Sequence, residues 1–210
     1  MNWDEFHAER ERLGRPFVIA HRGTPKREPE NTRRAFARAL EVGADVLETD
    51  LRFTADDEIV LIHDGTVDRT TDGTGAVGDF TLAELKRLRT RRPQDRQPGD
   101  QAVPTLIELL AMTQAETPLL LELKDPKFAG RHYAQKLIDI LACYNMLSRV
   151  AIISVQAPLV RSVKLVYPPI AAGYVTLNDP RPPRDAELAG PFWPLLLLNP
   201  FYVEDVHRLG

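Results

Sequence analysis

Three carboxylates lie on two short apolar segments of the sequence. Glu48 and Asp50 stand two positions apart within residues 46–51, and Glu122 lies within residues 119–123. Because side chains two apart on a strand share a face, Glu48 and Asp50 are expected to point the same way. Carboxylates held close together repel one another unless a cation neutralises them. Oxygen ligands favour Mg²⁺ or Ca²⁺ over zinc, so the pattern predicts one divalent cation, Mg²⁺ or Ca²⁺, bound by these three residues.

Two cationic residues and two histidines accompany the carboxylates. Arg22 follows His21, Lys124 stands two positions after Glu122, and His63 ends another apolar run. A divalent ion beside Arg22 and Lys124 is a suitable receptor for a phosphate diester, so both are predicted to bind substrate. Histidine transfers protons near neutral pH. His21 and His63 are therefore predicted to share the acid and base work, and the sequence does not say which does which.

Each of these residues also has an ordinary structural explanation when taken singly. A lone histidine at a strand end is usually structural. Glu48 and Asp50 alone would fit the solvated face of an edge strand, and Glu122 with Lys124 would fit a surface ion pair. The functional interpretation is favoured because four successive apolar runs all end in charged residues. Charged residues are rarely buried without partners.

Strand-like and helix-like segments alternate along the chain. Apolar runs predict strands at residues 17–20, 46–51, 59–62, 119–123, 150–154, 170–174 and 195–198. Amphipathic spacing predicts helices at residues 3–13, after a cap at Asn31 or Thr32, and at 82–88, 105–112, 132–141, 159–166 and from 203. The alternation indicates parallel pairing with right-handed crossovers. It favours an α/β fold of the (β/α) barrel type over a three-layer sheet, with the charged strand ends on one face.

The bulk composition is that of one soluble domain. A chain of 210 residues predicts a single barrel domain over residues 1–210, with the polar stretch at about 64–102 as a small insertion. The formal net charge of −3 gives no long-range attraction for nucleic acid. The one cysteine, Cys143, is expected to be a small buried residue. The composition does not predict an oligomeric state.

No segment of the sequence has the character of a membrane span or a leader. The longest apolar run covers residues 193–198, far short of the ~20 residues that a transmembrane helix needs. The N-terminal residues are acidic and lack the apolar run of a signal peptide. We therefore expect a cytoplasmic protein without a transmembrane segment.

Several motifs occur together in a fixed order. They are Ala20-His21-Arg22-Gly23, Pro29-Glu30-Asn31-Thr32, Gly43-Ala44-Asp45-Val46-Leu47-Glu48-Thr49-Asp50, Val60-Leu61-Ile62-His63-Asp64, Asp68-Arg69-Thr70-Thr71-Asp72-Gly73-Thr74-Gly75, Pro104-Thr105-Leu106 and Leu121-Glu122-Leu123-Lys124. In this order the motifs resemble those of the glycerophosphodiester phosphodiesterase family. The resemblance covers roughly residues 16 to 155. It implies a (β/α)8 barrel related to the phosphatidylinositol-specific phospholipases C.

The resemblance also implies an activity and a site. The activity is hydrolysis of a small-molecule glycerophosphodiester to glycerol 3-phosphate and an alcohol. His21 and His63 match the family's catalytic pair, the three carboxylates match its metal ligands, and the two cationic residues match its phosphate contacts. Glu30 and Asn31 lie beside the site in the family pattern, although loop ordering and helix capping explain them equally well.

One feature of the sequence departs from the family pattern. The family's barrel closes with an eighth strand that carries a Trp-Thr-Val-Asn-like motif, whereas this sequence stops at His207-Arg208-Leu209-Gly210. We therefore expect a barrel that lacks the last strand–helix unit and has two unpaired strand edges.

Two other functions are compatible with the sequence. One is a lysophospholipase D-like activity on lipids with one acyl chain, which needs an exposed apolar patch at the barrel mouth. Phe128, Tyr133, Phe192 and Trp193 are the candidates for it, although core packing explains each of them more simply. The other is a barrel that binds phosphorylated ligands without turning them over. The missing last strand is its only support, and the two histidines argue against it.

Overall fold

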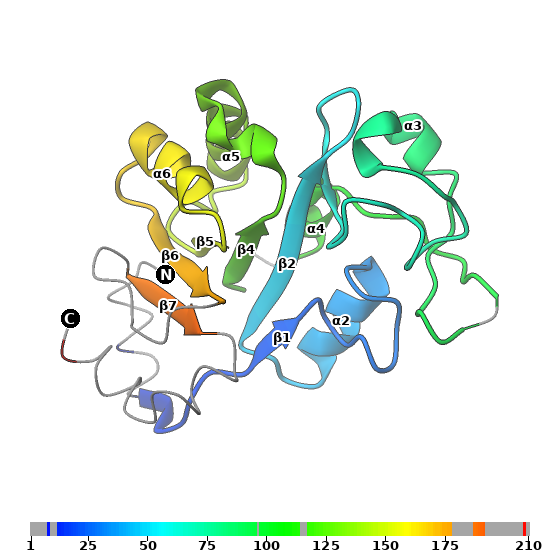
Figure 1. Cartoon of the computed structure of the whole chain (residues 1–210). Coiled ribbons are helices and arrows are strands. Elements are labelled where there is room, and N and C mark those ends of the chain that lie inside the picture. Colours follow the sequence, from blue (N-terminus) through cyan, green and yellow to red (C-terminus); the bar gives the residue numbers. More distant parts are fainter. Residues whose placement is uncertain are drawn as a thin grey trace.

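The protein folds as a curled, mainly parallel sheet with helices along its outer side (Figure 1). The structure is a computed structural model that describes residues 8, 12–95, 97–113, 117–177, 187–191 and 208. Its strands are β1 (Ile19–His21), β2 (Val46–Phe53), β3 (Ile59–Leu61), β4 (Leu119–Leu123), β5 (Val150–Ser154), β6 (Ala171–Thr176) and β7 (Leu188–Pro191). Its α-helices are α2 (Arg33–Glu41), α3 (Leu82–Leu85), α4 (Leu106–Met112), α5 (Arg131–Cys143) and α6 (Ala157–Val166), with short 3₁₀ turns at Val77–Asp79 and Pro126–Ala129.

The sheet order confirms an incomplete barrel of the (β/α)8 type. The strands follow one another as β1-β2-β4-β5-β6-β7, and every neighbouring pair on this path is parallel. Helices α4, α5 and α6 lie in the connections between successive strands, as the crossovers between parallel strands require. Within the described residues, β1 and β7 are the two edges of the sheet.

The prediction of a parallel strand at residues 59–62 is wrong. That segment forms β3, which pairs antiparallel with the far end of β2, so that Phe53 faces Ile59 and Leu51 faces Leu61. The reason is the length of the connection. Residues 54–58 are enough for a hairpin turn, whereas a parallel crossover needs about a dozen residues or more.

Some predicted elements lie outside the described residues. These are the strand at 195–198, the helix from 203 except for the helical residue 208, and most of the helix at 3–13. The structure adds β7 at Leu188–Pro191, which the sequence did not predict. Among the described residues, no helix is long and apolar enough to cross a membrane.

Caps fix the helices that flank the site. The Thr32 hydroxyl accepts a hydrogen bond from the Ala35 amide, so Thr32 rather than Asn31 caps α2. Gly43, at φ +84°, follows the end of that helix. Helix α4 begins with a capping box in which Thr105 and Glu108 bond each other's backbone amides.

The core divides the sheet into two faces. Alternate strand residues, such as Leu47 and Leu51 of β2 and Leu121 of β4, pack with the helices in the main apolar cluster. The intervening residues of the same strands, including Glu48 and Asp50, face the inside of the barrel because strand side chains alternate. The site therefore lies on the inner face, held by strands whose outer face is fully buried.

A second, smaller apolar cluster anchors residues 64–102. Its buried members are Val60, Ile62, Val67, Val77, Leu85 and Val103. Two of these belong to the β3 segment, so the loop that follows His63 packs directly on that hairpin. The segment predicted as an insertion thus borders the site.

The prediction that Cys143 is buried is wrong. The buried residues of α5 are Ala134, Leu137, Ile138 and Leu141, whereas Cys143 is exposed in its last turn. Two residues beyond Leu141 correspond to about 200° around a helix, which turns Cys143 away from the core.

Candidate active site

Strand register brings the three carboxylates together. Glu48 lies opposite His21 across β1 and β2, and Asp50 lies opposite Glu122 across β2 and β4. Glu48, Asp50 and Glu122 each offer a carboxylate oxygen, and these oxygens lie within 4.8 Å of one another. The predicted cluster is therefore present as one group on the inner face of the sheet.

The three carboxylates of the cluster place negative charge in a buried part of the protein. Glu48, Asp50 and Glu122 are 3%, 0% and 7% exposed. Burial, with the charge of Asp50 next, raises the pKa of Glu48 to about 8. The Asp50 Oδ1 atom is buried and has no hydrogen-bond partner among the described residues. A buried carboxylate oxygen without a donor is unusual, and a cation would satisfy it.

Lys124 and Arg22 border the cluster on two sides. Lys124 Nζ lies 2.6 Å from Glu122 Oε1 and 3.6 Å from Asp50 Oδ1. Arg22 Nε lies 3.1 Å from Asp50 Oδ2, and the backbone amide of Arg22 donates to Glu48 Oε2 at 2.9 Å. Both predicted substrate-binding residues thus stand beside the carboxylates.

The backbone at Arg22 is held in an uncommon conformation. Arg22 has φ +56° and is followed by Gly23 at φ +81°. A Cβ on Gly23 would lie 2.6 Å from the carbonyl carbon of Ala35, so α2 packs directly on this turn. The helix thereby fixes the turn that aims Arg22 at the carboxylates.

Asn31 belongs to the site rather than to a helix cap. Its Nδ2 donates to Asp50 Oδ2 at 2.9 Å, and its Oδ1 accepts a hydrogen bond from the Thr49 hydroxyl at 2.8 Å. Asn31 is 2% exposed. Of the two explanations that the sequence left open for it, the structure supports direct contact with a site residue. Asn31 fixes the orientation of the Asp50 carboxylate.

His21 stands at the edge of the cluster. Its Nε2 lies 3.9 Å from Glu48 Oε2, and most of its side chain is exposed. Loss of hydration on the shielded part of the ring, and then the positive charge of Arg22, lower its pKa. These effects disfavour the charged form of the His21 imidazole.

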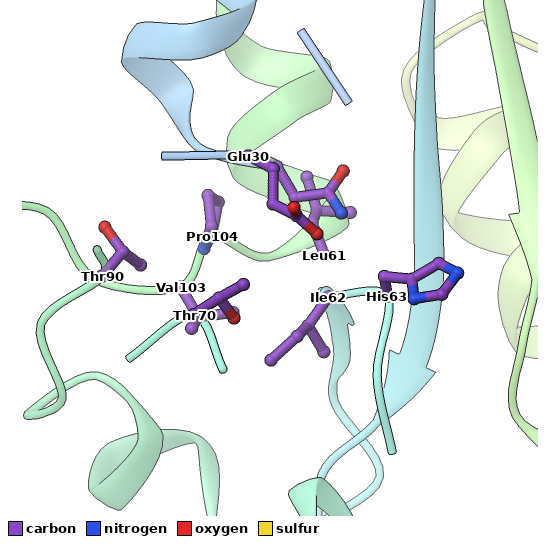
Figure 2. A pocket seen from close by; sticks show the side chains of 9 residues that line it. Glu30, Leu61, Ile62, His63, Thr70, Thr90, Val103 and Pro104 are labelled. Carbon is purple, nitrogen blue, oxygen red and sulfur yellow. The ribbon is translucent and has the colours of Figure 1, made fainter. Parts of the chain in front are cut away.

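His63 reaches the same region by way of the hairpin. Strand β3 runs back along β2, and the amide of Ile62 donates to the carbonyl of Asp50 at 3.1 Å, so His63 returns to the level of the carboxylates. A small pocket lies between β3 and the 64–102 segment (Figure 2). Its lining residues are Glu30, Asn31, Leu61, Ile62, His63, Thr70, Thr90, Val103 and Pro104. Figure 2 shows the imidazole of His63 pointing to the opposite side from Ile62.

A chain of hydrogen-bonded side chains links His63 to Arg22. His63 Nδ1 lies 2.7 Å from Asp64 Oδ1, and Asp64 Oδ2 accepts from Arg69 Nε at 2.5 Å. Arg69 also donates to both oxygens of Glu30, which accepts from Arg22 Nη1 at 3.1 Å. The sequence did not predict a role for Arg69, because it lies in a loop without periodicity.

The ion pair at Asp64 predicts a pH-dependent contribution to stability. The hydrogen bond from Arg69 lowers the pKa of Asp64 to about 2, below the ~3.9 of an unfolded chain. A carboxyl group with a depressed pKa stabilises the fold above its unfolded pKa, and this contribution is lost as pH falls toward 2. Asp64→Asn is therefore expected to lower the Tm at pH 6. Thermal unfolding of both proteins from pH 6 to pH 2.5 should show the difference shrinking below about pH 4, and a constant difference would contradict the assignment.

Two candidates for a lipid-binding patch are not exposed at a barrel mouth. Phe128 is fully buried and packs on Phe53 with ring centroids 4.6 Å apart. Tyr133 is half-buried against the same ring at 4.9 Å. Both serve the core, and Phe192 and Trp193 lie outside the described residues.

Comparison with known sequences points to one family. The sequence model of the glycerophosphoryl diester phosphodiesterase family matches residues 21–162, which include every predicted site residue. A glycerophosphodiester phosphodiesterase from Caldanaerobacter subterraneus is 40% identical over 158 residues, which are 75% of this chain and 65% of that relative. The chain thus spans slightly less than two thirds of the length of that relative.

Solved structures agree with the sequence comparison. A glycerophosphodiester phosphodiesterase from Agrobacterium tumefaciens aligns with a TM-score of 0.78 at 26% identity, covering 93% of this chain and 84% of its own. A phosphodiesterase from Oleispira antarctica, solved in complex with the product sn-glycerol-3-phosphate, aligns with a TM-score of 0.69 at 31% identity. That alignment covers 79% of this chain and 68% of the Oleispira chain.

Proposed function

The chain belongs to the glycerophosphoryl diester phosphodiesterase family, and from this premise we propose that it hydrolyses glycerophosphodiesters to glycerol 3-phosphate and an alcohol. The reaction depends on one divalent cation, Mg²⁺ or Ca²⁺. His21 and His63 are its acid–base pair, and Arg22 and Lys124 bind the phosphate. The Oleispira relative holds sn-glycerol-3-phosphate as its product, which supports this substrate class.

The observation that carries the proposal is the carboxylate cluster beside two cationic residues. Glu48, Asp50 and Glu122 are buried with carboxylate oxygens within 4.8 Å of one another, and Asp50 Oδ1 has no hydrogen-bond donor among the described residues. Three buried carboxylates are costly in a merely structural role, because each charge loses its hydration. The same three carboxylates are well suited to bind a cation through their oxygens. A metal-binding function therefore explains the energetic cost of burying them.

The residues present fit a divalent cation. Glu48, Asp50 and Glu122 would hold it, with Asn31 fixing the Asp50 carboxylate through the 2.9 Å hydrogen bond. When bound, the cation supplies Lewis-acid polarisation of a phosphoryl oxygen. Its charge also favours the ionised form of Glu48, reversing the effect of burial on that carboxyl group.

Arg22 and Lys124 orient the diester and offset its charge. In the transition state phosphorus is pentacoordinate, and its oxygens carry more negative charge than they do in the ground state. Both side chains are anchored by carboxylates, Arg22 by Glu30 and Asp50 and Lys124 by Glu122, so they are held in place before substrate binds. Fixed cations of this kind need no reorganisation during the reaction.

The two histidines move the protons. A nucleophilic oxygen, from water or from the substrate's own glycerol hydroxyl, attacks phosphorus, and the bond from phosphorus to the alcohol oxygen breaks. On the second route the product is a cyclic glycerol phosphate, which a water then opens to glycerol 3-phosphate. One histidine takes the proton of the nucleophile, and the other gives a proton to the departing alkoxide. The Asp64 contact occupies Nδ1 of His63, which leaves Nε2 for the substrate.

Metal removal is the experiment that tests this function. We expect a chelator to lower the release of glycerol 3-phosphate from glycerophosphocholine at least ~10²-fold, because the loss of charge stabilisation at phosphorus costs several kcal/mol. Adding back Mg²⁺ or Ca²⁺ is expected to restore the rate. The measurement is an enzyme-coupled assay for glycerol 3-phosphate, with the chelator presaturated by Mg²⁺ as the control.

The same assay separates the alternatives. Full activity in excess chelator would contradict metal dependence. Faster turnover of a detergent-dispersed lysolipid than of glycerophosphocholine would favour the lysophospholipase D-like activity. Binding of glycerol 3-phosphate without hydrolysis of any diester, with either ion present, would favour the non-catalytic barrel.

A further inference from the structure

Arg69 directs its guanidinium at two carboxylates. Its Nη1 and Nη2 donate to the two oxygens of Glu30 at 2.8 and 2.7 Å, and its Nε donates to Asp64 Oδ2 at 2.5 Å. The paired contact to Glu30 has the fork geometry that arginine makes with a carboxylate and that lysine cannot reproduce. The Glu30 side chain is 11% exposed and that of Arg69 is 35% exposed, so the pair is partly shielded from water.

Glu30 ties this arrangement to the loop between β1 and α2. Glu30 precedes Asn31, and the backbone amide of Asn31 donates to the backbone carbonyl of Arg22 at 3.1 Å. Burial alone would raise the pKa of Glu30, but the hydrogen bonds from Arg69 and the charge of Arg22 lower it, so Glu30 stays ionised as an anchor. The position of Arg69 is therefore set by the β1 side of the site.

Asp64 is the carboxylate that Arg69 holds toward the histidine. Its Oδ2 bonds Arg69, which leaves Oδ1 against His63 Nδ1 at 2.7 Å. A carboxylate at Nδ1 fixes both the ring orientation and the tautomer of a neutral imidazole. Without Arg69, the half-exposed Asp64 side chain can rotate into solvent, because the other hydrogen bond to its carboxylate comes from His63 itself.

We propose that Arg69 is a positioning residue for His63: anchored by Glu30, it holds the Asp64 carboxylate against Nδ1 so that Nε2 faces the substrate. This inference rests on the proposed diesterase function. It gives the loop after His63 a second use, since that loop borders the site and also supplies the residue that orients its histidine.

The alternative is that Arg69 only fastens the loop to the barrel. The loop has other attachments that do not involve Arg69. The backbone amide of Ala55, in the turn before β3, donates to the carbonyl of Phe80 at 2.8 Å, and Val77 of the loop lies with Val60 of β3 in the second apolar cluster. Loss of Arg69 is therefore expected to leave the loop folded, so that its effect on His63 can be measured.

The test compares Arg69→Gln and Arg69→Lys with Arg92→Gln. Arg92 is the matched control, because it makes a paired contact with Asp95 at 2.8 Å in the same segment without reaching a site residue. Two quantities are measured: kcat and KM for glycerol 3-phosphate release, and the ¹⁵N shifts of the His63 imidazole, assigned with His63→Gln. The imidazole shifts report the tautomer and need no activity.

We expect Arg69→Gln to lower kcat ~10–100-fold with KM within about threefold, because a misplaced catalytic group costs rate more than binding. The His63 shifts should move from the Nδ1–H tautomer toward a mixture. Arg69→Lys should give the same change to a smaller degree, because lysine keeps the charge but cannot make the paired contact with Glu30. If Arg69→Gln does not fold, Arg69→Lys takes its place in the test. Arg92→Gln should match the wild type.

Two results would overturn the proposal. One is a kcat for Arg69→Gln and Arg69→Lys within twofold of the wild type. The other is a lower kcat with unchanged His63 shifts, which would place the effect elsewhere. If the wild-type chain releases no glycerol 3-phosphate, the proposed function fails, while the imidazole shifts still test the contact among Arg69, Asp64 and His63.

Discussion

Asp50→Asn is expected to lower kcat/KM for diester hydrolysis at least ~10³-fold while the protein stays folded. Asp50 is the central carboxylate of the cluster and is fully buried, and its Oδ1 has no hydrogen-bond partner in the part of the chain that the structure describes. An amide is a far weaker ligand than a carboxylate for a hard cation such as Mg²⁺. Loss of roughly 4 kcal/mol of charge stabilisation at phosphorus corresponds to about a thousandfold in rate.

The fold should tolerate this change because the replacement keeps the shape of the side chain. The amide oxygen of an asparagine can still accept the hydrogen bond from Asn31 that Asp50 Oδ2 accepts at 2.9 Å. The substitution also removes one of three repelling charges, and the charge of Asp50 is among the causes that raise the pKa of Glu48. In the absence of a cation, the Tm of Asp50→Asn should equal or exceed that of the wild type, as at other sites where function costs stability.

Asp45→Asn is the matched control for this variant. Asp45 directly precedes β2, at the opposite end of the strand from the site, where it pairs with Arg15 and accepts from the Val18 amide. We expect its loss to lower the Tm and leave kcat/KM within twofold. Thermal unfolding with and without Mg²⁺ or Ca²⁺ gives a second measurement, because a ligand that binds only the folded state raises its stability. Full activity in Asp50→Asn, or an undiminished Tm shift with the cation, would contradict the assignment of Asp50 as a metal ligand.

Local chemistry was sufficient to predict several elements. The predicted bounds of β4 and β5 agree with the structure, because each is a short, almost purely apolar run of the kind buried on both faces of a parallel sheet. The start of α4 was also predicted correctly, since Thr105 and Glu108 stand at capping-box spacing. These signals involve only neighbouring residues, which is why the sequence carries them.

Pairing direction was harder to predict because it depends on connections rather than on periodicity. Residues 59–62 have the same apolar character whether β3 is parallel or antiparallel. The informative signal was the short turn at 54–58, in which Asp57 takes φ +61° and the Thr54 hydroxyl accepts from the Glu58 amide. A connection of that length admits a hairpin and excludes a crossover.

The sequence predicted which site residues share a face of the sheet, but it did not predict which of their side chains contact one another. The spacing of Glu48 and Asp50 placed both on one face, and the strand ends placed His21 and Lys124 near them. Register across β2 and β4, which pairs Asp50 with Glu122, comes from tertiary packing. The contact of Arg69 with Asp64 depends on a loop whose path no local pattern encodes.

Removal of either histidine is expected to lower kcat for glycerophosphocholine at least ~10²-fold. General acid–base groups contribute about 10²–10⁴-fold, and His21 and His63 are the two residues predicted to carry the proton transfers. His21→Ala and His63→Ala leave the carboxylate cluster unchanged, because neither ring is in the set of oxygen ligands. Their Tm shift on adding Mg²⁺ or Ca²⁺ should therefore match that of the wild type.

The choice of leaving group assigns the two roles. A nitrophenolate can depart without a proton, whereas the alkoxide of choline needs a proton in order to depart. With glycerophospho-p-nitrophenol as substrate, the variant that lacks the general acid should recover most of the wild-type rate. The variant that lacks the general base should stay at least ~10²-fold slow with both substrates. The histidine whose alanine variant recovers is therefore the general acid, and the other is the general base.

His132→Gln is the control for these variants. His132 is exposed in the first turn of α5 beside Tyr133, and we expect its replacement to leave both rates unchanged. Recovery of either histidine variant would identify its missing residue as the general acid and keep the mechanism. Wild-type rates in both histidine variants would contradict acid–base catalysis by this pair, because the cation and the two cationic side chains would then suffice to break the bond.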